Sequence, residues 1–71
     1  MNLAEIAKEL NCSMRNPDSI DLENSTFNLV MHWLESNGFI RLKAPPRNGT
    51  IIFKKDQFII RFDTIGGFLY T

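Results

Sequence analysis

Apolar and polar residues along this chain follow two different periods. In the first ten residues the apolar side chains Leu3, Ile6, Ala7 and Leu10 are spaced three and four apart, the pattern of a helix with one buried face. Helical spacing returns over residues 25–37, where apolar side chains fill about two-thirds of the circumference, and Gly38 marks the end. We therefore expect a central helix there, covered on most sides by other elements.

The segment between these two helices is short and polar. Asn16 suits an N-cap, Pro17 suits the first helical position, and Asp18 would lie at the positive end of a helix dipole. These features predict a short additional helix over roughly residues 17–23.

The second half of the chain has the alternation of strands. Residues 39–43 read as a strand, and residues 50–63 read as a β-hairpin that turns at Asp56 and Gln57. One hairpin face is predicted to enter the core: Ile51, Phe53, Phe58, Ile60 and Phe62. Residues 64–71 would add a strand, pack on the hairpin or meet a second subunit.

Composition indicates one small domain spanning residues 1–71. The 71 residues are 44% hydrophobic and include six phenylalanines, enough for one core. Cys12 is a single cysteine, which we interpret as a small core residue in a reducing, cytoplasmic protein. Neither a signal peptide nor an apolar run of about 20 residues is found, so we expect no membrane association.

The net charge of zero divides unevenly along the chain. Residues 1–40 hold two cationic and six anionic side chains, a net −4, and residues 41–71 hold six cationic and two anionic ones, a net +4. Such a split is typical of a protein with one face toward an anion, or of solvated strands rich in lysine and arginine.

Two stretches resemble a known family. "VMHWLESNGFIRL" (residues 30–42) and "LAEIAKELNCS" (residues 3–13) are similar to segments of winged helix-turn-helix domains. The resemblance implies an α+β fold: a three-helix winged helix with a small antiparallel sheet whose β-hairpin is the wing. In two respects the sequence departs from the family: Asn11 stands where glycine is usual, and helix 25–37 contains Glu35 but no Lys or Arg.

The resemblance further implies binding to double-stranded DNA, as in a transcriptional regulator. Helix 25–37 would lie in the major groove, and hairpin 50–63 would contact phosphates. The implied DNA-binding residues are Asn24, Ser25, Thr26, Asn28, His32, Arg47, Lys54 and Lys55. About three phosphate contacts predict a salt slope near −2.7, weak for a monomer, so an operator-binding protein of this kind would be a homodimer.

Other functions compete with DNA binding. Asn24, Ser25 and Asn28 also read as a helix cap and a solvated stripe. The same fold would alternatively bind a protein partner through an apolar patch formed by Ile52, Ile59, Phe68 and Tyr70. RNA binding is weaker because the hairpin phenylalanines are needed in the core. We expect no enzyme activity, no catalytic residues, no metal site and no cofactor, since no nucleophile–base pair or metal-ligand spacing is present.

Overall fold

A computed structural model describes residues 2–16, 19–43 and 48–71 of the protein. In these residues there are two α-helices, one 3₁₀ turn (η1) and six strands. In chain order they are α1 (Leu3–Leu10), β1 (Met14–Asn16), β2 (Ser19–Asp21), η1 (Asn24–Thr26), α2 (Phe27–Ser36), β3 (Ile40–Arg41), β4 (Thr50–Lys55), β5 (Phe58–Asp63) and β6 (Phe68–Tyr70).

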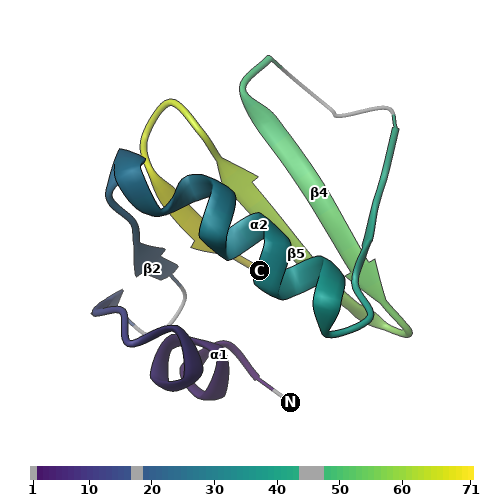
Figure 1. Ribbon diagram of the computed structural model, residues 1–71, viewed down its shortest axis with the longest axis horizontal. Coiled ribbons are helices and arrows are strands. Elements are labelled where there is room, and N and C mark those ends of the chain that lie inside the picture. Colours follow the sequence, from purple (N-terminus) through teal and green to yellow (C-terminus); the bar gives the residue numbers. More distant parts are fainter. Residues whose placement is uncertain (1, 17–18, 44–47) are drawn as a thin grey trace.

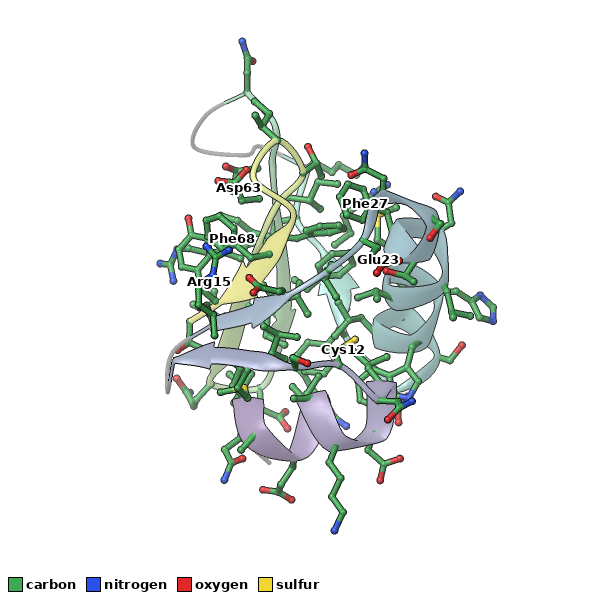
Figure 2. All side chains as sticks on the ribbon, turned by 90° about the vertical axis from the view of Figure 1, so that its left-hand side faces the viewer. Cys12, Arg15, Glu23, Phe27, Asp63 and Phe68 are labelled. Atoms are coloured by element: carbon green, nitrogen blue, oxygen red, sulfur yellow. The ribbon has the colours of Figure 1, made fainter. Side chains whose placement is uncertain are left out.

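The strands form one antiparallel sheet with the order β1-β2-β6-β5-β4-β3. Helix α2 runs across one side of this sheet, and α1 lies below β2 at one end of the core (Figure 1). Seen from the side, α2 stands to the right of the sheet (Figure 2). The molecule therefore has two layers, and the covered side of the sheet is called here the helix face.

The core lies between the helix face and the helices. Strand pairing places Phe53 opposite Ile60, and Phe62 between Ile51 and Leu69, so that these side chains share one face. Phe27 of α2 meets Phe62 edge to face, with 4.9 Å between the ring centroids. The fully buried side chains are Ile6, Ile20, Val30, Leu34, Phe53, Ile60, Phe62 and Leu69.

Three expectations about individual elements are confirmed. The first helix is present as α1, where Asn2 and Glu5 form a capping box and Asn11 ends the helix in a left-handed conformation with φ of 55°. The hairpin is present as β4 and β5, paired through Lys55 and Phe58 around a two-residue turn. The third is the helix ending before Gly38, which is α2.

The expected three-helix winged-helix fold is wrong. The helix predicted over residues 17–23 is replaced by β1 and β2, which pair with each other, while residues 17 and 18 lie outside the described residues. Residues 19–23 alternate strictly between polar and apolar side chains, as a strand does, and Ile20 pairs with Leu69 of β6. The C-terminal segment thus adds a strand, and this strand joins β2 to the hairpin.

The expectation of a helix covered on most sides is also wrong. Helix α2 buries Val30 and Leu34 completely, whereas Met31 and Trp33 are half-buried and Leu29 is 66% exposed. A helix lying on one side of a sheet buries a single stripe, and its other side meets water. The outward surface of α2 is consequently open along its length.

Candidate functional site

The polar residues expected to read DNA lie together at the start of α2 and along its outward side. Asn24 and Ser25 are exposed in η1, and Asn28 and His32 are exposed on α2. The hydroxyl of Thr26 donates to the Glu23 carbonyl oxygen at 2.7 Å, and α2 begins without a hydrogen bond from a capping side chain. The expected side-chain cap is therefore wrong, and the remaining residues form a solvated stripe.

The expected cationic residues do not meet this stripe. Lys54 and Lys55 are neighbours on β4 and point to opposite sides of the sheet. On the helix face, Nζ of Lys55 donates to the Asn37 carbonyl oxygen at 2.8 Å and lies 6.0 Å from the Phe39 ring centroid. This position is at the C-terminal end of α2, whereas the polar stripe begins at its N-terminal end, roughly 15 Å away at 1.5 Å per residue.

Lys54 lies on the side of the sheet that faces away from both helices. Arg47 lies outside the described residues. Of the three cationic residues expected to contact phosphate, the two that are described thus belong to different surfaces. The structure therefore gathers the polar residues of the expected DNA site and places the two described lysines, Lys54 and Lys55, apart from them.

The side of the sheet opposite the helices is called here the outer face. No helix of the described residues lies on it, and in Figure 2 Phe68 and Arg15 project from it on the side away from α2. Strand pairing and alternation assign it Arg15, Ser19, Asp21, Ile40, Leu42, Thr50, Ile52, Lys54, Ile59, Arg61, Asp63, Phe68 and Tyr70.

Large apolar side chains are exposed on the outer face. Ile40 is 69% exposed, Leu42 39% and Ile59 37%, and Ile52 is half-buried beside them. The rings of Phe68 and Tyr70 continue the surface on β6, with 5.5 Å between their centroids. The outer face of a sheet that only met water would be mainly polar, so this surface is unusually apolar for a solvated one.

The structure brings together the four apolar residues expected at a protein interface, Ile52, Ile59, Phe68 and Tyr70. Ile40 and Leu42 also lie on this face, and they were not among the residues predicted from the sequence to form a protein interface. Their signal was available: Gly38 ends α2, Phe39 enters the core, and alternation then turns both side chains outward. Arg41 points to the helix face, where its guanidinium lies 5.9 Å from the Phe53 ring centroid.

Charged side chains lie at both ends of the outer face, and Arg61 lies between them. Lys54 lies next to Ile59 near the hairpin turn, while Asp63 and Asp21 flank Phe68 at the other end. Asp63 accepts hydrogen bonds from the backbone N–H groups of Ile65 and Gly66, and both use its Oδ1 atom. Nε of Arg15 is 3.2 Å from Asp21 Oδ2 across the β1–β2 pair.

Both edges of the sheet are poor templates for another strand. On one side β3 has two residues and is followed by Lys43. On the other side β1 has three residues and an irregular register against β2. Short strands, charged side chains and irregularities of this kind prevent edge-to-edge pairing. Binding at this sheet is consequently favoured on its face rather than at its edges.

The described residues offer little for catalysis. Cys12 packs against the core, its Sγ donates to the Leu10 carbonyl oxygen at 3.4 Å, and burial raises the pKa of its thiol, which lowers the thiolate fraction. His32 lies 3.4 Å from the Ser36 hydroxyl on the exposed side of α2. Within the described ranges, no three His, Cys, Asp or Glu side chains are grouped as metal ligands would be.

Comparisons with known proteins add no relative. No protein-family model matches the chain, no curated protein matches it, and no solved structure matches it. Neither helix in the described part of the chain has the length and apolar character needed to cross a bilayer.

Proposed function

We propose that this protein is a protein-binding module and that the outer face of its sheet is the binding surface. The observation that carries the proposal is the exposure of Ile40, Leu42 and Ile59 on one side of a sheet whose other side is covered by helices. Exposed apolar side chains on a small domain are unfavourably hydrated. Covering them with a partner removes their surface from water and is therefore favourable. Single cysteine usage suits a cytoplasmic partner.

DNA binding through α2 stays an untested prediction, and the geometry gives it less support. A helix that enters the major groove needs cationic side chains beside it to hold phosphates. Lys55 instead holds the C-terminal end of α2, and Lys54 lies on the outer face. The chain also has no net positive charge to attract a duplex.

The proposal can be tested by placing a photo-reactive amino acid at one surface position in the cells that make this protein. The probe at Ile52, on the outer face, should give a defined cross-linked protein band on illumination. The matched control is the probe at Leu29, which is exposed on the outward side of α2 and should give none. Equal cross-linking from both positions, or cross-linking from position 29 alone, would contradict the proposal.

A titration with random duplex DNA tests the competing function. We expect no association at low salt concentration, because the cationic side chains are dispersed. Binding that weakens with salt and disappears in the Lys54→Ala/Lys55→Ala double variant would favour DNA, provided that its circular dichroism spectrum shows that the variant is folded.

A further inference from the structure

We propose that the partner on the outer face is a second copy of this chain, packed sheet against sheet. This inference rests on the proposed function, because it takes the outer face as the binding surface and names its occupant. It is carried by the arrangement of charge and apolar side chains on that face, which is complementary to itself.

Strand pairing sorts the outer face into three rows that run across the strands. The row nearest the hairpin turn contains Ile40, Lys54 and Ile59. The middle row contains Ile52, Arg61 and Tyr70, and Leu42 joins it because its N–H donates to the Ile52 carbonyl oxygen. The far row contains Thr50, Asp63, Phe68 and Asp21, of which Thr50 is buried and Asp21 is paired with Arg15. Ser19 also lies on the middle row beside Tyr70, so the two ends are separated by Leu42, Ile52 and Tyr70 together with Arg61 and Ser19.

A two-fold axis along the middle row makes this arrangement match its own copy. Such a rotation stacks each strand on its counterpart and exchanges the two end rows, so Lys54 of one copy lies over Thr50 of the other, one strand away from Asp63. Asp63 uses Oδ1 for its own turn, and within the described residues its Oδ2 has no hydrogen-bond partner. Sheets packed face to face at about 10 Å, with strands within about 30°, permit this contact.

Net charge and sheet edges favour the same arrangement. Two copies of a neutral chain do not repel each other at long range. Both edges are short and irregular or charged, so growth by strand addition is disfavoured. Packing on the outer face also gives a closed dimer, because each copy has one such face.

The size of the face sets the expected affinity. The six strands contain 23 residues in all, which at about 3.3 Å per residue and about 4.8 Å between strands gives a footprint of roughly 360 Å², and projecting side chains increase its accessible area. Stable complexes bury about 600 Å² or more on each partner, so this interface lies at the weak end. We expect a reversible dimer with a dissociation constant on the order of 100 μM.

One residue opposes the dimer and therefore tests its geometry. Arg61 is on the middle row, so the rotation brings it near the Arg61 of the second copy. Removing this like-charge pair should strengthen association. Arg61→Met is consequently expected to lower the dissociation constant about threefold.

Sedimentation equilibrium between 10 μM and 1 mM measures the effect of each substitution. Ile52→Asp should raise the dissociation constant at least about 30-fold, and Lys54→Glu should raise it about fivefold. The matched control is Leu29→Asp, which places the same charge on an exposed apolar residue of α2 and should leave it unchanged. Circular dichroism confirms folding, and Lys54→Glu alters an exposed side chain that the fold does not need.

The outcomes separate this inference from the proposed function. A wild-type chain that remains monomeric at 1 mM overturns the second copy as partner. Dissociation by Leu29→Asp but not by Ile52→Asp also overturns it, as does a Lys54→Glu variant that associates more tightly. If the monomeric chain still cross-links from position 52 to another protein in cells, the proposed function stands; without that product, both fail.

Discussion

Adjacent residues on β4 show how one step along a strand separates two roles. Lys54 points to the outer face, where it is exposed, whereas Lys55 reaches the C-terminal end of α2 and donates to the Asn37 carbonyl oxygen. A positive charge at that end offsets the negative end of the helix dipole and satisfies a carbonyl group that has no partner within the helix. Lysine at position 55 is therefore part of the fold, and lysine at position 54 is available for binding.

Exchanging each lysine for methionine separates these two roles. Lys55→Met should lower the free energy of unfolding by roughly 1 kcal/mol, because the helix end loses its charged donor. Lys54→Met is the control and should change it by less than about 0.5 kcal/mol, since the side chain is exposed. Urea unfolding measures the stability of both variants at a protein concentration of about 5 μM, far below the dissociation constant expected for the dimer. Equal destabilisation by the two substitutions would contradict the separate roles of Lys54 and Lys55.

At the scale of elements, helices with clear end signals were predictable and the second strand was not. Asn2, Asn11 and Gly38 are residue types suited to the ends of helices, whereas the capping box of Asn2 with Glu5 is seen in the structure. Pro17 allows either a first helical turn or a tight turn, so it did not decide between them. The strand β2 forms because Ile20 pairs with Leu69, about fifty residues later, and local pattern does not reveal such a partner.

The capping box of α1 provides a test at this scale. In Asn2→Ala the Glu5 N–H loses its side-chain acceptor, and stability should fall by about 1 kcal/mol. Asn2→Ser keeps an acceptor at the N-cap and should stay within a few tenths of a kcal/mol of the native chain. Thermal unfolding followed by circular dichroism would show a midpoint about 4–8 °C lower for the alanine variant alone. Similar midpoints for all three chains would show that the cap does not support α1.

For the whole molecule, the sequence supports the hairpin and its core side but not the layer arrangement. The alternation of Phe53, Ile60 and Phe62 specifies which hairpin face is buried. It does not specify that two helices rather than three would accompany the sheet. That number depends on residues 19–21 forming a strand, which β6 joins to β5. The described residues of the expected DNA site lie apart for the same reason: Lys54 and Lys55 were chosen by residue type, and the sheet order decides the surfaces on which they lie.

The polar side chains on α2 are consequently separated from Lys54 and Lys55, whereas Ile40, Leu42 and Ile59 share the outer face with Lys54 and Arg61 between the apolar positions. A small two-layer domain with one uncovered sheet face has most of its exposed apolar residues in one place. This links the fold to the proposed function: the side of the sheet that the helices leave open is the surface that we propose binds a partner.

The most direct test is to find which residues change their amide chemical shifts as the protein concentration is raised. Amide ¹H–¹⁵N spectra recorded from 20 μM to 1 mM should show shifts confined to the outer-face strands, centred on Ile52, Arg61 and Tyr70, with Asn28, Leu29 and His32 of α2 unchanged. Shifts centred on α2, with the outer face unaffected, would contradict the claim that the uncovered sheet face is the binding surface.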